Sequence, residues 1–310
     1  NGSAVGGGAG PTFKTFGTNS IMIGDDATGT ISGANYNTGL GVDVFASLTS
    51  GDNNVAVGYE SLKSITSQSQ NVAVGYQALR LNTAEMNTAV GAYTLSSNTS
   101  GSHNTAVGRL AAEKITTGAF NTVVGSGALA NNTTGANNTA FGYNTGVSNT
   151  TGSSNTAIGY QAGYSTTNGE NNVSLGFNAL FSGGPRNNNV AIGKSALQNN
   201  NASNNTAVGM NAAHNNTTGT GNASLGYHAL FANTSASYNT ALGMFAVKGN
   251  TTGASNTGVG YKALFANTTA SNNTAVGYNA LLANTTGNSN VAIGHEAGTD
   301  VTTGSDNIAI

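Results

Sequence analysis

Apolar and polar residues follow one another in short blocks that recur along nearly the whole chain. Each block reads Asn, a β-branched residue, a small residue, an apolar residue and Gly, as in NTAVG and NVAIG. The closing Gly recurs every 17 residues from Gly24 to Gly294, except for two intervals of 16 that follow Gly75 and Gly193. A fixed short period is typical of a solenoid and not of a disordered low-complexity chain.

Counting the Asn as position 1 and the Gly as position 5, positions 2 to 4 predict a strand. Position 2 is mostly Thr or Val, position 3 mostly Ala, and position 4 always apolar. Positions 2 and 4 therefore share one face of the strand, and position 3 lies on the other. Positions 12 to 15 commonly read Asn-Thr-Thr-Gly, which is a turn sequence. Because 17 residues are too few for two helices, we expect an all-β parallel β-solenoid with one coil per repeat.

We expect the apolar residues of positions 2, 4 and 9 to face the interior, so that stacked coils form apolar columns. Stacked Asn residues would form a ladder of amides. Gly at position 5 would provide a corner that a side chain would obstruct. The expected structural core contains Val57, Val74, Val107, Ile158, Ile192, Val276 and Ile293. The expected Asn ladder contains Asn54, Asn71, Asn104, Asn155, Asn273 and Asn290.

The small residues of positions 3 and 8 would let a neighbouring chain approach closely. We interpret them as a subunit interface around a shared axis. The alternative is that Ala merely fills a narrow interior. The candidate interface contains Ala89, Ala106, Ala157, Ala207 and Ala275.

The pentads NVAIG and NTAIG resemble the head repeats of YadA-like trimeric autotransporter adhesins, and the longer form NTAVGYxALxxNTTG resembles repeats of phage tail-fibre proteins. The resemblance covers about residues 19 to 310. It implies a left-handed β-roll and a homotrimeric rod. It also implies other fibre or tail proteins at the ends of the rod, and a host-surface glycan or protein as the target.

Two segments differ from the repeat. Residues 1–19 lie outside the register and predict a cap or junction, whereas residues 20–310 form the solenoid of about 17 coils. The chain stops within a pentad at Ile310, so we expect the solenoid to continue or to be truncated there. The segment SGGPRN, residues 182–187, replaces a turn and is expected to protrude. The two shorter coils are expected to lose their residue in a turn, which keeps the strands in register.

Composition excludes several function classes. The net charge is −2 and only 6% of residues are charged, which disfavours nucleic acid as a partner. There is no Cys, so thiolate metal sites and cysteine nucleophiles are absent. The chain has no apolar run of about 18 residues that would insert into a membrane. The N-terminus lacks the pattern of a secretory signal peptide.

The sequence offers little catalytic chemistry. Asp43 and Glu60 fall in neighbouring coils but, as we read the repeat, at different positions, so they predict no catalytic pair. The four His residues are dispersed and are expected on the surface. Asp25 and Asp26 are either a polar turn or a cation site. Tyr at position 6 either packs against neighbouring coils or forms a platform for sugars.

Three functions stay open. The first is a fibre shaft of a phage tail or virion appendage, the second the head of a bacterial surface adhesin, and the third an ice-binding solenoid with rows of Thr. We expect no enzyme activity, no cofactor and no metal. The expected location is the virion, the extracellular space or a cell surface.

Overall fold

The computed structural model describes residues 12–15, 18–24, 33–184 and 186–310, with backbone only for 12–15. The chain divides into two units, Asn1–Gly152 and Ser153–Ile310. Neither unit contains a helix in its described residues. None of these residues therefore forms a helix that could cross a membrane.

Each repeat contributes one short strand at the pentad, as the sequence predicts. The first unit contains β1 (Thr12–Thr15), β2 (Ile21–Gly24), β3 (Thr38–Gly41), β4 (Val55–Val57), β5 (Val72–Val74), β6 (Thr88–Val90), β7 (Thr105–Val107), β8 (Thr122–Val124) and β9 (Thr139–Phe141). The second unit contains β10 (Thr156–Ile158), β11 (Val173–Leu175), β12 (Val190–Ile192), β13 (Thr206–Val208), β14 (Ala223–Leu225), β15 (Thr240–Leu242), β16 (Thr257–Val259), β17 (Thr274–Val276), β18 (Val291–Ile293) and β19 (Ile308–Ala309).

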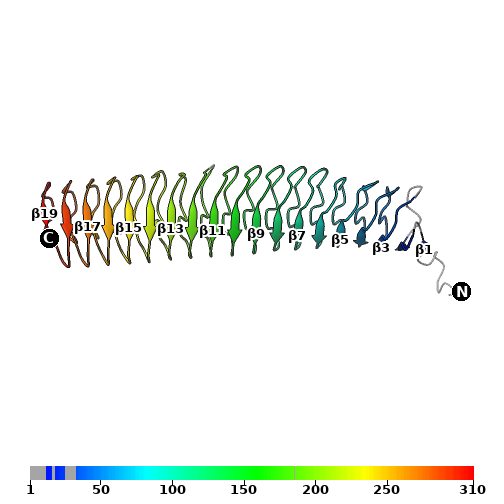
Figure 1. Ribbon diagram of the computed structural model, residues 1–310, viewed down its shortest axis with the longest axis horizontal. Helices are drawn as coiled ribbons and strands as arrows, with labels where there is room; N and C mark the ends of the chain where they lie inside the picture. The colour runs from blue at the N-terminus through cyan, green and yellow to red at the C-terminus, as the bar shows by residue number, and fades with distance from the viewer. Residues whose placement is uncertain (1–11, 16–17, 25–32, 185) are drawn as a thin grey trace. The chain divides into compact units, whose positions relative to one another are not determined.

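Within each unit the strands stack in parallel and in chain order, β2 to β9 and β10 to β19 (Figure 1). Each residue pairs with its equivalent in the next repeat, so Val55 pairs with Val72. The register also holds across the 16-residue coil, where Val72 pairs with Thr88. The parallel β-solenoid with one coil per repeat is therefore confirmed. At the N-terminal edge, β1 pairs with β2 in antiparallel orientation.

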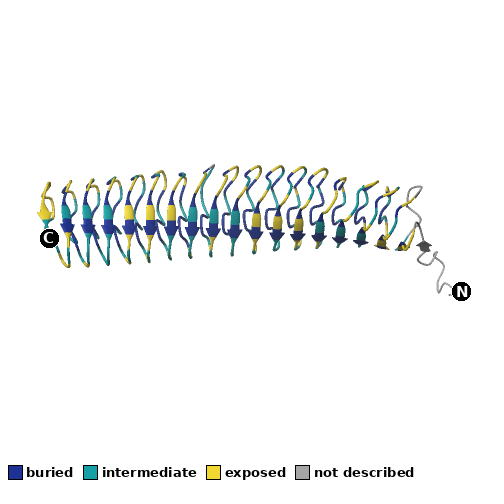
Figure 2. Ribbon diagram, viewed as in Figure 1, coloured by how far each residue is buried: buried dark blue, intermediate teal, exposed yellow. Residues whose placement is uncertain are grey.

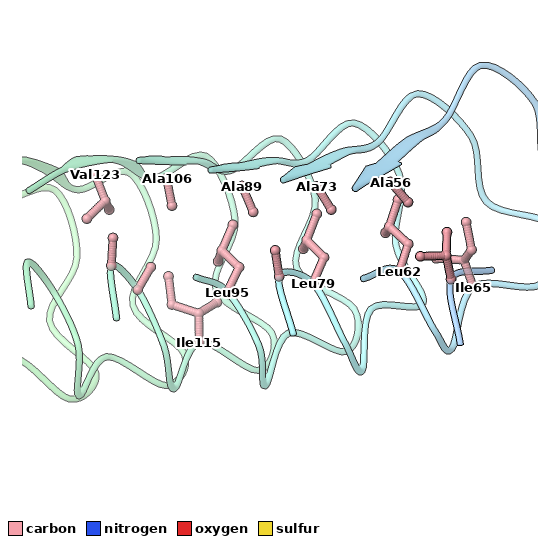
Figure 3. Packing of buried hydrophobic residues seen from close by; sticks show 14 of the residues in the cluster. Ala56, Leu62, Ile65, Ala73, Leu79, Ala89, Leu95, Ala106, Ile115 and Val123 are labelled. Atoms are coloured by element: carbon pink, nitrogen blue, oxygen red, sulfur yellow. The ribbon is translucent and has the colours of Figure 1, made fainter. Parts of the chain in front are cut away.

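The interior of each coil is narrow. Figure 3 shows the position-3 residues Ala56 and Ala73 pointing across it toward Leu62 and Leu79 of the opposite wall. These leucines occupy position 9, and all four residues are fully buried. Burial of a Leu side chain stabilises a fold by about 1.5–3 kcal/mol, and the facing Ala leaves it the space to enter.

The expected core is wrong, because positions 2 and 4 face outward. The position-4 residues Val57, Val74, Ile158, Ile192 and Val276 are half-buried, and Val107 and Ile293 are exposed. The physical reason is the period of two along a strand: the Asn of position 1 is buried, so position 3 shares its inward face and positions 2 and 4 cannot. Figure 2 shows this alternation of burial along the strands.

The expected interface is wrong for the same reason. Its members are buried inside their own chain and cannot contact another one: Ala89, Ala106, Ala157, Ala207 and Ala275. The alternative interpretation, that Ala fills a narrow interior, is confirmed.

Glycine at position 5 is required by the next coil. A Cβ on Gly108 would lie 2.7 Å from both the carbonyl carbon and the oxygen of Gly125. The backbone φ of Gly108 is also +131°, a conformation that other residues rarely adopt. Two independent constraints therefore require glycine at the predicted corner: the positive backbone angle and the close contact with the backbone of the next coil.

Three further corners of the coils are left-handed, and in most coils none of them is a glycine. In the coil of β4 these are Glu60 (φ 54°), Leu62 (φ 48°) and Gln70 (φ 63°). Such angles are unfavourable for residues with a Cβ and persist where surrounding contacts impose them. Here hydrogen bonds to the neighbouring coils hold the corners, as when the N–H of Glu60 donates to the carbonyl oxygen of Val42.

The expectation that residues 182–187 protrude is wrong. Arg186 is 1% exposed, and its guanidinium donates to the carbonyl oxygens of Leu180 (2.7 Å) and Asn200 (2.5 Å). It enters the space that position 12 leaves empty, because Gly183 stands there without a side chain. Burial lowers the pKa of Arg186 to about 10. The side chain thus replaces the missing position-12 side chain with a cation held by carbonyl groups.

Candidate functional surfaces

The Asn ladder of position 1 is confirmed. The backbone N–H of Asn54 donates to Oδ1 of Asn37 (2.9 Å), and its Nδ2 donates to the carbonyl oxygen of Gln68 (3.0 Å) within the same coil. Asn71 repeats this pattern on Asn54. Each Asn side chain therefore links two neighbouring coils and also connects the two ends of the coil to which it belongs. The predicted members Asn54, Asn71, Asn104, Asn155, Asn273 and Asn290 are all buried.

A second amide column lies at position 12, and our reading of the sequence missed it. Asn267 Nδ2 donates to Asn250 Oδ1 (2.8 Å), and Asn284 Nδ2 donates to Asn267 Oδ1 (3.1 Å). The same Nδ2 of Asn284 donates to the carbonyl oxygen of Gly287 (3.0 Å). The Asn of the Asn-Thr-Thr-Gly sequence could have indicated this column, but we interpreted it only as a turn residue.

The Thr column of position 13 does not offer free hydroxyl donors. Thr251 Oγ1 donates to the carbonyl oxygen of Thr268 (3.0 Å), and Thr268 Oγ1 donates to that of Thr285 (3.1 Å). Each hydroxyl proton is therefore used between coils of the protein. This arrangement takes the position-13 row out of the ice-binding hypothesis, whereas the Thr residues of position 2 face outward on the strands.

The outward face of the strands is apolar. At position 4 it presents Leu225 of β14, Leu242 of β15 and Ile293 of β18, which are 48%, 43% and 46% exposed. Position 2 adds Thr or a small or branched aliphatic residue in every strand from β2 to β19, and neither position holds a charged residue. Within each unit the face is therefore uncharged and apolar at every position 4, and large exposed apolar patches mark interaction sites.

The aromatic rings of position 6 stack on one another. The ring centroids of Tyr261 and Tyr278 lie 5.3 Å apart, and those of Tyr278 and His295 lie 5.0 Å apart at 7°. In the first unit Tyr59 stacks on Tyr76 at 5.3 Å. Since neighbours cover the ring faces, the column presents ring edges and hydroxyl groups. The packing alternative is thereby supported over the sugar platform.

Residues at positions 7 and 10 form the variable edge of the coils. Asp43 and Glu60 both occupy position 7, so our expectation that their positions differ is wrong. Lys63 at position 10 bridges them, with Nζ 2.9 Å from Asp43 Oδ2 and 2.6 Å from Glu60 Oε1. The hydrogen bond from Lys63 is the main cause that lowers the pKa of Glu60, and the same bond raises the pKa of Lys63. Two ionised carboxylates held by one ammonium group form a structural link between coils.

Metal-binding side chains do not converge in the described residues, where no three His, Asp or Glu form a group that could hold an ion. His103 and His295 are exposed as expected, whereas His214 and His228 are half-buried. The proposed cation site at Asp25 and Asp26 lies outside the described residues.

A scan of protein-family models finds no match to this chain, and a search of curated proteins finds no relative. The function is therefore argued from the chain's own surfaces.

Proposed function

We propose that the protein is a structural shaft of a homotrimeric fibre, such as a phage tail fibre or another virion appendage, that supports attachment to a host surface. The observation that carries this proposal is the apolar outward face of the strands. The stacked coils provide a stiff element through hydrogen bonds of the strands, the Asn ladder and the position-12 column. The resemblance of the repeat to phage tail-fibre proteins supports the same function.

The outward face has the composition and extent of an obligate interface. Such interfaces are depleted of charged residues at their centre and enriched in apolar side chains. The second unit alone has nine consecutive full strands, β10 to β18, with two outward residues each, which makes 18. A standard interface has about 20–30 residues on each side, so this face and its flanking residues suffice.

The interface of the proposed trimer therefore differs from the one expected from the sequence. The Val, Ile, Leu and Thr side chains of positions 2 and 4 would contact the other chains, and the Ala column would remain internal. Burial of exposed apolar area on association is favourable by roughly 25 cal/mol per Å². A long strip of medium-sized side chains can thus stabilise the trimer without a single large side chain that dominates the interface.

Native mass spectrometry of the purified chain tests the proposal, and we expect the mass of three chains. The double variant Val259→Asp/Val276→Asp places two carboxylates on the outward face of β16 and β17. It should keep the β-sheet circular dichroism of the wild type but lose the trimer, because a charge buried without a partner is strongly unfavourable.

The matched control is Thr252→Asp/Thr269→Asp, which adds the same charges at exposed turn positions and should remain trimeric. A wild-type chain that is monomeric at micromolar concentration would refute the trimeric shaft. A double variant that stays trimeric would show that the strand face is not the interface.

A further inference from the structure

The variable edge of the second unit carries a cluster of cationic and aromatic side chains in the coils of β13 to β16. We call it the cation–aromatic edge. It consists of residues at positions 6, 7 and 10: His214, Tyr227, His228, Phe231, Phe245, Lys248, Tyr261, Lys262 and Phe265. It lies outside the strand face to which we assign the trimer.

The rings of this edge form a continuous set of contacts. His228 stacks on Phe231 with centroids 4.6 Å apart and lies 4.2 Å from Tyr227. Phe231 stacks on His214 at 5.4 Å, and Phe245 meets Tyr227 edge-on at 5.3 Å. Side chains from successive coils, which are about 4.8 Å apart, thus form one half-buried aromatic surface.

Two ammonium groups converge on this surface. Lys248 Nζ lies 5.1 Å from the ring centroid of Phe245 and 5.3 Å from that of Phe265. Lys262 Nζ lies 5.5 Å from the same Phe265 ring and 5.2 Å from that of Tyr261. The rings hold both lysines over the edge through cation–π contacts and so position two positive charges near each other.

No carboxylate compensates these charges. The sequence from Asn171 to His295 contains four Lys and Arg residues but neither Asp nor Glu. The ion pairs found among the described residues involve Lys63 and His295, not Lys248 or Lys262. In a chain whose net charge is −2, this region is locally cationic.

Two polar atoms at the edge lack partners among the described residues. The Nε2 of His228 lies 3.1 Å from the Nδ2 of Asn211. An amide NH₂ can only donate, so Nε2 accepts and the proton of the neutral ring is on Nδ1. This Nδ1 is buried without a hydrogen-bond partner, and so is Oδ1 of Asn279 on the coil that follows Lys262. Both atoms are enclosed by the protein and do not face solvent.

The surroundings of His228 are cationic and contain no carboxylate. Its pKa is lowered, first by burial and then by the positive charges of Lys248 and His214. The groups that face it are the rings of Tyr227, Phe231 and Phe245, none of which is acidic.

We propose that the cation–aromatic edge binds an acidic saccharide, one that carries sulfate or carboxylate groups. The anionic group would accept hydrogen bonds from the ammonium groups of Lys248 and Lys262. The exposed part of the aromatic surface, where Tyr227 is 40% exposed, would pack against the sugar ring. The inference gives the shaft a ligand of its own and does not require the trimer.

An acidic saccharide fits this edge better than nucleic acid does. Binding a nucleic acid backbone relies on neutralising many phosphates, and here only two lysines converge. The ring faces are covered by neighbouring rings and by the lysines, so bases could not stack on them as they do on single-strand binding surfaces.

Isothermal titration of the full chain with three probes tests the proposal: a heparin hexasaccharide, an oligogalacturonate and a neutral dextran oligomer. We expect binding of at least one acidic probe, weakened by salt, and none of dextran. The double variant Lys248→Gln/Lys262→Gln should bind about tenfold more weakly or worse, since it removes two charged contacts. The control Lys114→Gln/Lys194→Gln removes two charges elsewhere and should stay within about twofold.

The acidic probes also separate the two sources of negative charge, because the first carries sulfate groups and the second only carboxylates. Absence of binding to both would overturn the proposal. An equal loss in the two double variants would also overturn it, since binding would then follow diffuse charge. Tighter binding of a single-stranded oligonucleotide than of either saccharide would assign the edge to nucleic acid instead. The native mass of each variant, measured in parallel, reports on the trimer separately.

Discussion

At the scale of single residues, asparagine is the structural centre of this protein. A buried Asn side chain offers one acceptor oxygen and two donor hydrogens, which match the free groups of stacked coils. Asn273 accepts from the N–H of Asn290 (2.9 Å) and donates to the carbonyl oxygen of Gly287 (2.9 Å). An ionised Asp could accept but not donate, whereas Ser20 at position 1 of the first pentad makes both equivalent bonds. Its hydroxyl accepts from the N–H of Asn37 (2.9 Å) and donates to the carbonyl oxygen of Ala34 (3.2 Å).

We therefore expect Asn273→Ala to destabilise the fold by about 2–4 kcal/mol. The substitution leaves the N–H of Asn290 buried without a partner, which costs about 1–3 kcal/mol. It also removes one of the two donors to the carbonyl oxygen of Gly287, which keeps Asn284 Nδ2, and a lost hydrogen bond of this kind costs about 0.5–1.5 kcal/mol. Urea unfolding followed by circular dichroism measures the change.

The control is Asn168→Ala, which alters an exposed Asn of the turn at position 14, outside both amide columns. Its Oδ1 accepts only from the hydroxyl of the neighbouring Thr167, at 3.3 Å and in contact with solvent. This variant should shift stability by less than about 0.5 kcal/mol. Equal effects of the two variants would contradict the role of the ladder.

At the scale of the single coil, the glycine column of position 5 sets how closely two coils approach. Neighbouring glycines are so close that any side chain would overlap the next backbone. The strands contribute only three paired residues in most coils. The close approach of the glycines therefore also keeps the hydrogen bonds between neighbouring coils aligned outside the strands.

Gly108→Ala tests this column. We expect a loss of at least about 1–3 kcal/mol from the left-handed backbone angle alone, with an added cost from the contact with Gly125. The melting temperature should fall clearly below that of the control Gly184→Ala, where a Cβ would meet only Asn201 Oδ1 at 3.7 Å. A variant that melts like the wild type would mean that neighbouring coils can separate at little cost.

At the scale of the whole molecule, the chain is a repeat protein, and within each unit a coil is hydrogen-bonded to its neighbouring coils. In such proteins stability is approximately a sum of terms for single repeats and for neighbouring pairs. Damage in one coil should therefore remain local instead of unfolding the molecule as one cooperative domain.

Hydrogen exchange with mass spectrometry on the same variants measures this locality. For Asn273→Ala we expect faster exchange of amides in β16 to β18 and unchanged exchange in β4 to β7. For Gly108→Ala we expect faster exchange of amides near β7 and β8 and unchanged exchange in β16 to β18, because local opening is controlled by local contacts. Uniform acceleration along the chain in either variant would show that it unfolds as one unit.

The sequence by itself determined the fold, the register and the Asn ladder. The spacing of the pentads identifies one coil per repeat, and identical side chains at a fixed spacing must stack once the coils do. The loss of one residue in each short coil also follows from the sequence, because a turn can absorb a deletion without shifting the strands.

Only the tertiary structure decided which side of the strand faces inward. Val276 is apolar and Ala275 is apolar but small, so hydrophobicity alone favours the larger residue for the core. The buried Asn273 fixes the parity of the strand instead, and the facing Leu264 and Leu281 leave room only for Ala. The cluster at Lys248, the bridge at Lys63 and the buried Arg186 were equally beyond a reading of the repeat. Each of these three features involves residues at the few positions of a coil where the sequence departs from the repeat. Their side-chain contacts form only once neighbouring coils stack.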